Sequence, residues 1–478
     1  MERIRSFFSE NAAVGKLRAW MLTPAYPAFF AVFALLSYCT GTELYIGAMF
    51  VLVGCTGLLI CKDLRPMIAP LLTFVFALSI HNAPQLPTHS DYYYSTPVLV
   101  VTAIAAALVA VSLVLHFVIW QGAAIYYRHR PMLWHVCIAL ALGLVLNGVF
   151  AEWRFTDTLY GAAQAALWIL FYLLFLYGLP YNKKTVEYFC ICCFFIILLL
   201  AGELIYIYLH HGVAANGIIR KYLILFGWGV HNNLGGIMVW LIPAMFYLAA
   251  TRKNGWFYFL AAIGAYVCAI FTMSRSAMLV GGAVMLICLI SVCVKGNNKG
   301  LYRSFLCVMG AVFVIAVFAF WRELAQLFSF TLSQGFEDSG RLSIWRNSIM
   351  VFAEHPIFGG GFHSVPFESW AGDVPGHCHN TVIEMLCACG AVGCIAYLVY
   401  RAATVRMFVR YMTLERFYMG MVIVGLLGVS LLDNHLFNYY PPFFYTVALA
   451  FGERDYRGIL DTLGQGDRLL GVTALPRQ

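Results

Sequence analysis

Residues 97–120 read PVLVVTAIAAALVAVSLVLHFVIW and contain no aspartate, glutamate, lysine or arginine. About 20 consecutive apolar residues in a helix cross a hydrocarbon core of about 30 Å, so this stretch is long enough to span a membrane. Its backbone groups would find no water there, and only a helix satisfies all of them within one segment. The stretch therefore predicts a membrane-spanning α-helix.

The composition of the whole chain agrees with this segment. Of 478 residues, 62% are hydrophobic and only 11% are charged, and the mean hydropathy is +0.80. Soluble domains contain about 25% charged residues, so a water-soluble core does not account for this composition. A membrane barrel would need alternating segments of about ten residues, which are not seen. We predict an all-α polytopic membrane protein.

Apolar stretches of similar length recur along the chain. We expect a bundle of about 14 transmembrane helices, or about 12 or 13 if the shortest segments re-enter the membrane without crossing it. The predicted segments are 24–40, 44–61, 67–81, 97–120, 132–151, 158–180, 188–209, 233–250, 256–272, 277–294, 304–321, 381–400, 417–433 and 441–451.

Basic residues indicate the orientation of the bundle. With a cytoplasmic N-terminus, 23 of the 30 lysines and arginines lie on the cytoplasmic side, as the positive-inside rule requires. The net charge of +8 is then an orientation signal, and no nucleic-acid partner is needed. The first apolar run lacks a small-residue cleavage site and predicts a retained signal anchor. We expect both termini in the cytoplasm.

One connection, residues 321–380, is much longer than the others and faces outward. Long loops in compact proteins are usually functional. Of the fifteen cysteines, only Cys378 lies clearly in an outer loop, so no loop disulfide is expected. The loop also contains four histidines: His355, His363, His377 and His379.

Within this loop, DSGRLSIWRNSIMVFAEHP predicts an amphipathic helix that begins after Asp338 or Ser339 and ends at Pro356. Its apolar stripe favours packing on the membrane surface or against the bundle, which is a sufficient role by itself. A second interpretation starts from Arg341 in the first turn, where free N–H groups favour a phosphate. The apolar stripe comprises Leu342, Trp345, Ile349 and Phe352.

Other polar residues lie at the outer ends of predicted spans. Arg275 in FTMSRSAML is costly at that depth unless it is paired, lines a wet cavity or extends to the interface. Arg220 precedes LFGWGVHNNLGG, in which His231 is a candidate helix cap or surface residue. Several arginines around one cavity bind diphosphate oxygens well, because each guanidinium offers two parallel donors. We therefore predict an outward diphosphate site edged by Arg220, Arg275 and Arg341.

Three other interpretations remain open. A zinc site could use His363, His377, Cys378 and His379, although the usual ligand spacings are absent. A lipid-linked oligosaccharide flippase or other polytopic transporter would also have many spans and a basic cavity, but it would place charges in mid-membrane. A membrane acyltransferase with an active histidine is the third.

The chain resembles the O-antigen ligase and polymerase superfamily of bacterial surface-glycan assembly. The resemblance rests on GWGVHNNLGG, on the SRS element of FTMSRSAML, and on GRLSIWRNSIMVFAEHPIFGGGF followed by HNTVIEMLCACGAVG. It covers about residues 220–400. It implies an inverting glycosyltransferase, without a metal or other cofactor, that moves a glycan from undecaprenyl diphosphate to an acceptor sugar at the outer face of the bacterial cytoplasmic membrane.

The resemblance also implies roles for single residues. Arg275 and Arg341 match the diphosphate-binding arginines, and His379 matches the histidine near the acceptor hydroxyl. Arg220 is a looser match. The neighbouring His377 leaves open which histidine acts. As further substrate-binding candidates we take His231, Asn380, which can cap the following span, and Glu384, which can orient the His-Asn motif or be a buried polar residue.

The implied partners are a lipid-linked glycan donor, a glycan or lipid A core acceptor, membrane lipid and other glycan-assembly proteins. Ligase and polymerase differ in the acceptor and are not separated by the sequence. We divide the chain into N-terminal transmembrane helices (1–220), a catalytic core (221–400) that includes loop 321–380, and C-terminal helices with a cytoplasmic tail (401–478).

Overall fold

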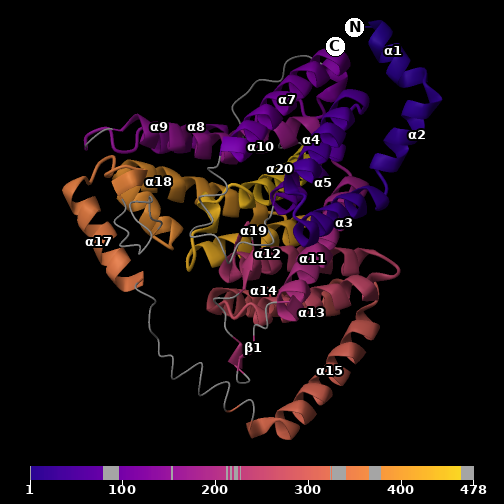
Figure 1. The fold of residues 1–478 in the computed structure, drawn as a ribbon, viewed down its shortest axis with the longest axis vertical. Helices are drawn as coiled ribbons and strands as arrows, with labels where there is room; N and C mark the ends of the chain where they lie inside the picture. The colour runs from indigo at the N-terminus through magenta and orange to yellow at the C-terminus, as the bar shows by residue number, and fades with distance from the viewer. Residues whose placement is uncertain are drawn as a thin grey trace.

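A computed structural model describes most of the chain, and it is a bundle of helices (Figure 1). The predicted all-α polytopic architecture is confirmed. The only described strands have two residues each and form two short antiparallel hairpins, which pair Ala214 with Ile219 and Leu225 with Val230. The described residues are 2–78, 96–151, 154–210, 214–215, 218–219, 224–226, 228–322, 325, 341–364 and 378–463.

Helices coincide with the predicted apolar segments, although α18 and α20 continue well past the predicted ends at 400 and 451. The helices are α1 (Glu2–Glu10), α2 (Ala12–Met21), α3 (Ala25–Thr40), α4 (Glu43–Ile60), α5 (Arg65–Ala77), α7 (Thr96–Trp120), α8 (Trp134–Val145), α9 (Phe155–Ala165), α10 (Phe171–Gly178), α11 (Lys183–His210), α12 (His231–Thr251), α13 (Gly255–Phe271), α14 (Arg275–Lys295), α15 (Lys299–Ala319), α17 (Arg341–Glu354), α18 (Thr381–Val409), α19 (Leu414–Ser430) and α20 (Pro441–Thr462). A π-helical segment (Ala166–Leu170) joins α9 to α10, and short 3-10 helices cover Gln121–Ala124, Phe362–Ser364 and His435–Phe437. The strands are β1 (Ala214–Ala215), β2 (Ile218–Ile219), β3 (Leu225–Phe226) and β4 (Gly229–Val230).

Fewer helices than predicted are long enough to cross a membrane. Among the described residues, eight helices meet both length and hydropathy requirements, and the pair α2 and α3, bent by 69°, would make a ninth. The apolar helices α5, α8 and α13 are shorter. Helix α8 ends at Val145, before the predicted boundary at 151, because the chain turns at Gly148, whose φ is +67°.

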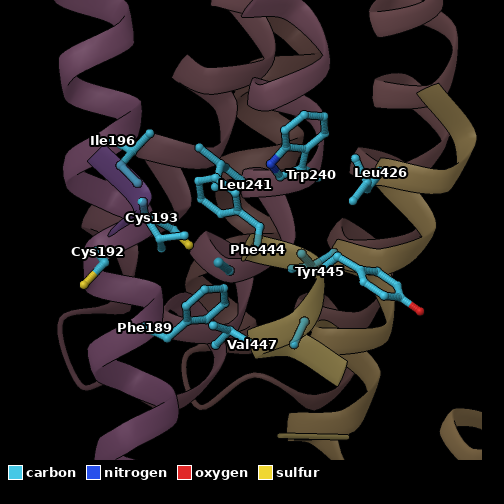
Figure 2. Close-up of a cluster of buried hydrophobic side chains, with 14 of the residues drawn as sticks. Phe189, Cys192, Cys193, Ile196, Trp240, Leu241, Leu426, Phe444, Tyr445 and Val447 are labelled. Atoms are coloured by element: carbon cyan, nitrogen blue, oxygen red, sulfur yellow. The ribbon is translucent and has the colours of Figure 1, made fainter. Parts of the chain in front are cut away.

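Helix α12 forms the centre of the bundle. Of its apolar window, 94% is buried, and it packs against α11, α13, α14 and α19. Figure 2 shows this core, in which Trp240 and Leu241 of α12 gather with Phe189 of α11 and Phe444 of α20. A helix this apolar on all sides is expected in the interior, so α12 fixes the positions of its neighbours.

Helix α15 is the opposite case. It extends away from the bundle (Figure 1), and only 6% of its apolar window is buried. Apolar side chains such as Val308, Ile315 and Phe318 are exposed along it. In a membrane protein such a surface is compatible with lipid, so α15 needs no protein neighbour.

Helix α18 is interrupted in its first half, where the loop that follows α17 packs against it. Gly390 has φ +63° and ψ −164°, which interrupts the helix. The loop restores the missing hydrogen bonds: Gly360 and Gly361 donate to Cys387 and Ala388, and Ala391 and Val392 donate to Pro356 and Ile357. We call the segment Pro356–Gly361 the glycine loop, and it lies in backbone contact with α18.

Helix α17 is the predicted amphipathic helix, and it ends before Pro356 as expected. Its apolar stripe, however, is not buried as a whole against the bundle. Leu342 and Ile349 are 63% and 51% exposed, whereas the indole of Trp345 donates to the Cys378 carbonyl at 2.7 Å. The buried Ser348, whose Oγ lies 3.1 Å from Cys378 Sγ, and Trp345 hold this side of the helix beside Cys378.

Candidate active site

The candidate site is assembled around the first turn of α18. Asn380 caps this helix, since its side-chain oxygen accepts hydrogen bonds from the N–H groups of Val382 (2.9 Å) and Ile383 (3.1 Å). Its amide nitrogen donates to the Leu431 carbonyl at 3.0 Å. Thr381 donates to Asn434 at 2.9 Å. The cap predicted from the sequence thus also joins α18 to the connection between α19 and α20.

Glu384 fixes the residues just before the helix. Its carboxylate accepts a hydrogen bond from the Cys378 backbone N–H at 2.7 Å, and the side chain is almost fully buried. Trp345 holds the carbonyl of the same residue. The peptide groups on both sides of Cys378 are therefore fixed, and this determines the direction in which the next residue, His379, leaves the chain.

His379 has a left-handed backbone conformation, with φ +52°, and lies beside an aspartate. Its Nδ1 is 2.9 Å from Oδ1 of Asp433, and a third of its side chain is exposed. Left-handed φ is uncommon for a residue other than glycine and costs energy unless its surroundings hold it. The contacts of Glu384 and Trp345 with Cys378 supply that restraint.

Asp433 is ionised in this environment. Burial raises the pKa of its carboxyl group, but the hydrogen bond from His379 and the electrostatic influence of the neighbouring imidazoles and of Arg341 lower it more. The net effect holds the pKa of Asp433 well below its usual range. The structure therefore brings Arg341, at the start of α17, into the electrostatic environment of the His379–Asp433 pair.

His435 lies directly behind this pair. It is fully buried, its ring packs edge-on against Trp240, and a Cβ at Gly236 would be 2.6 Å from its ring nitrogen. Burial lowers the pKa of His435, although the charge of Asp433 acts in the opposite direction. His435 is therefore neutral in the folded protein near pH 7.

Two adjacent glycines of α12 contact different neighbours: one faces the turn before Arg275, and the other faces His435. A Cβ at Gly235 would be 2.7 Å from Thr272 Oγ1 and 3.0 Å from Ser274 Cβ, whereas Gly236 faces His435. The turn that carries Arg275 thus packs on α12 one residue away from the His435 contact. Arg275 itself is the first residue of α14 and is exposed, and Ser274 caps the helix by accepting the Ala277 N–H.

His231 is the first residue of α12, and it is partly buried. The cap of this helix is made by Asn233, whose side-chain oxygen accepts the Val230 N–H at 3.0 Å. His231, Arg275, Arg341, His379, Asn380 and Glu384 all lie at helix starts or one turn from them, but their predicted roles in binding or catalysis remain predictions. Arg220 and His377 lie outside the described residues.

A second histidine–aspartate pair anchors the glycine loop. Asp157, at the start of α9, accepts the backbone N–H of His363 at 2.8 Å and also contacts its Nδ1. The carboxylate is 2% exposed, and a Cβ at Gly361 would be 2.7 Å from it. This pair joins the loop after α17 to α9, whereas the first pair joins α18 to α19.

Sequence patterns did not predict Asp433, His435 or Asp157. Asp433 is 54 residues from His379, and Asp157 is 206 residues from His363, so no local spacing relates the partners. One signal was available: an acidic residue at the end of an apolar span is costly and usually has a function. Within the described residues, no three His, Cys, Asp or Glu side chains form a possible metal site.

Comparisons with known proteins give one match. Residues 237–398 match the family model described as O-antigen ligase. A search of curated proteins finds no match. The matched segment runs from the buried part of α12 through Arg275, α17 and the first pair's His379 to the middle of α18.

Proposed function

We propose that the chain transfers a glycan from undecaprenyl diphosphate to an acceptor sugar, because residues 237–398 match the family model described as O-antigen ligase. The family implies a lipid-linked donor and a glycan acceptor in a membrane, and the apolar helices support a multi-pass inner-membrane protein. The proposal adds the diphosphate carrier, inversion at the transferred sugar, independence from metal, an outward-facing site and cytoplasmic termini.

The His379–Asp433 contact is the observation that carries the proposal. Asp433 accepts a hydrogen bond from Nδ1–H of His379, so the lone pair of the histidine is on Nε2. His379 is partly exposed and can meet an acceptor hydroxyl. A base with this orientation can remove the hydroxyl proton while the anionic partner stabilises the imidazolium that forms.

In the proposed reaction, the acceptor oxygen attacks the anomeric carbon of the donor sugar. The bond from that carbon to the diphosphate oxygen breaks, the electron pair leaves with the lipid diphosphate, and the hydroxyl proton moves to Nε2 of His379. Attack opposite the leaving group inverts the configuration. Arg275 and Arg341 are proposed to stabilise the diphosphate as its negative charge grows.

The family match favours this function over the transporter and acyltransferase alternatives. Ligase and polymerase differ in the acceptor, and deletion of the gene separates them. Accumulation of single repeats on the lipid carrier indicates a polymerase, and accumulation of complete chains indicates a ligase. Unchanged surface glycan in the deletion strain would contradict both.

A purified reaction tests the chemistry more directly. With a lipid-diphosphate glycan and an acceptor, Arg275→Ala is expected to lower the transfer rate about 100-fold to 1,000-fold, as loss of one charge-stabilising donor does in other enzymes. Arg322→Ala is a matched control, because it removes an exposed arginine from the same predicted outer side. EDTA is expected to leave the rate unchanged. Full activity of Arg275→Ala, or strong inhibition by EDTA, would contradict the proposed roles.

A further inference from the structure

A second polar region lies where the helical segment that begins near Asp157 ends. The segment Phe155–Gly178 forms one candidate membrane span. Asp157 is near its first end and Tyr177 near its last, and 20 residues of helix correspond to about 30 Å. This is about the thickness of the hydrocarbon core, so the two ends lie near opposite faces of the membrane.

At the Tyr177 end, two adjoining hollows open on the surface, with volumes of about 460 Å³ and 380 Å³. Both are lined by Arg128 and His129, from the connection between α7 and α8. Arg130 lines the first hollow, and Arg454 and Arg457 of α20 line the second. We call the pair the basic hollow.

The basic hollow carries excess positive charge. Its lining contains four arginines and one acidic residue, Asp461, which leaves three uncompensated positive charges with His129 counted as neutral. Asp461 contacts the Arg457 guanidinium at 3.1 Å and His129 at 3.7 Å. The acidic residues behind the wall are already engaged, since Glu453 bonds to Tyr127 and the Met132 N–H, and Asp455 pairs with Arg416.

The hollow is a built structure rather than a set of loose surface chains. The Tyr126 N–H donates to the Tyr177 carbonyl at 2.8 Å, and the Met132 N–H donates to Glu453 at 2.8 Å, which fixes both ends of the connection. Arg457 is 3% exposed, and its guanidinium lies 3.1 Å from His129 Nδ1. The backbone that carries Arg128 and Arg130 is therefore fixed, and Arg457 is held beside it.

Aromatic side chains surround these charges. Tyr126, Tyr127, Tyr177, Tyr181 and Trp134 line the same hollows. Tyrosine and tryptophan are enriched at the level of lipid headgroups, where one end of the ring is apolar and the other is polar. The composition of the wall thus places the basic hollow at the membrane interface.

We propose that the basic hollow binds the phosphate group of an anionic membrane phospholipid. Guanidinium groups match phosphate oxygens in geometry, and basic pockets between transmembrane helices bind anionic headgroups. General attraction of basic residues to one side of the membrane would not require a walled space or a buried arginine. The site is separate from the proposed transfer reaction, and its test does not measure glycan transfer.

The test uses native mass spectrometry of the full chain purified from vesicles that contain phosphatidylglycerol and phosphatidylcholine. We expect wild type to retain phosphatidylglycerol selectively. The double variant Arg128→Gln, Arg130→Gln removes two exposed arginines of the wall and should retain it at least about fivefold less. The control Lys183→Gln, Lys184→Gln removes the same charge from exposed positions at the start of α11, outside the lining, and should retain the wild-type amount.

Each outcome decides the proposal. Equal losses in the two double variants would show general electrostatic attraction and overturn it, as would full retention by the arginine variant. A thermal unfolding midpoint equal to that of wild type shows that each variant is folded. If millimolar inorganic phosphate binds to the protein while phosphatidylglycerol does not, the ligand is a soluble phosphate and the lipid assignment is wrong.

Discussion

His379 contacts Asp433 through Nδ1, and His363 contacts Asp157 through Nδ1, but the surroundings of the two pairs differ. Asp157 is almost fully buried and also accepts the backbone N–H of His363, so it fixes the path of a loop. Asp433 is more exposed and lies within the field of Arg341. The same residue types thus form an anchor in one place and a candidate base in the other.

The largest expected effect is the loss of glycan transfer when the histidine of the His379–Asp433 pair is removed. His379→Ala should lower the rate of glycan transfer about 100-fold to 10,000-fold, the usual contribution of a general base, with unchanged amounts of protein in the membrane. His355→Ala, at another histidine near the end of α17, should retain activity. A fully active His379→Ala protein would remove the proposed difference between the two pairs.

Asp433→Asn tests whether the negative charge beside His379 contributes to the transfer rate. Asparagine keeps an oxygen near Nδ1 but removes the negative charge that would stabilise the imidazolium, so transfer should fall about tenfold to 100-fold. Steady-state rates of the purified protein measure this change. Asp461→Asn is the control, because it alters a His–Asp contact at the opposite end of the bundle. Equal rates for both variants would contradict the role of Asp433.

Asp157→Ala should affect stability more than chemistry. It leaves the backbone N–H of His363 without its acceptor, and an unsatisfied buried group costs about 1–3 kcal/mol. A lower thermal unfolding midpoint in detergent is the expected readout, with transfer at permissive temperature within about fivefold of wild type, or about 1 kcal/mol in the barrier. Loss of transfer with an unchanged midpoint would instead identify His363–Asp157 as the reacting pair.

The smallest expected effect is a pH dependence of protein stability caused by His435, which lies behind the His379–Asp433 pair. The pKa of His435 is lower in the folded protein than its ordinary value of 6.5, so the unfolded chain binds more protons below that pH. The free energy of unfolding should therefore be constant in this respect above about pH 6.5 and decrease as the pH falls below it, by at most about 1.4 kcal/mol per pH unit.

Unfolding midpoints measured between pH 5 and pH 8 test this dependence. His435→Gln should flatten the curve over the same range, whereas His210→Gln, which changes an exposed histidine, should leave its slope unchanged. Asp433 does not contribute to the slope in this range. Because its pKa is lowered in the folded protein, its carboxylate stabilises the fold above about pH 3.8, and this stabilisation is lost only at lower pH. If the slope of unfolding midpoint against pH is unchanged in His435→Gln, a residue other than His435 causes the pH dependence.

Local sequence was sufficient for much of the helix architecture and part of the site. Hydropathy located the helices, Pro356 marked the end of α17, and Asn380 was identified as a cap from its position before an apolar run. Contacts between distant segments were not predictable. The break at Gly390 was invisible because GAVG continues an apolar pattern, and the conformation depends on hydrogen bonds from the separate glycine loop.

The same break has a consequence for biogenesis. Synthesis produces Pro356–Gly361 before Gly390, yet α18 has unsatisfied peptide groups until that earlier segment docks against it. We therefore expect α18 to be completed only when the loop docks against it. The backbone amides of Gly360 in the loop and Ala391 in α18 should then show equal protection from hydrogen exchange, because both open in the same event.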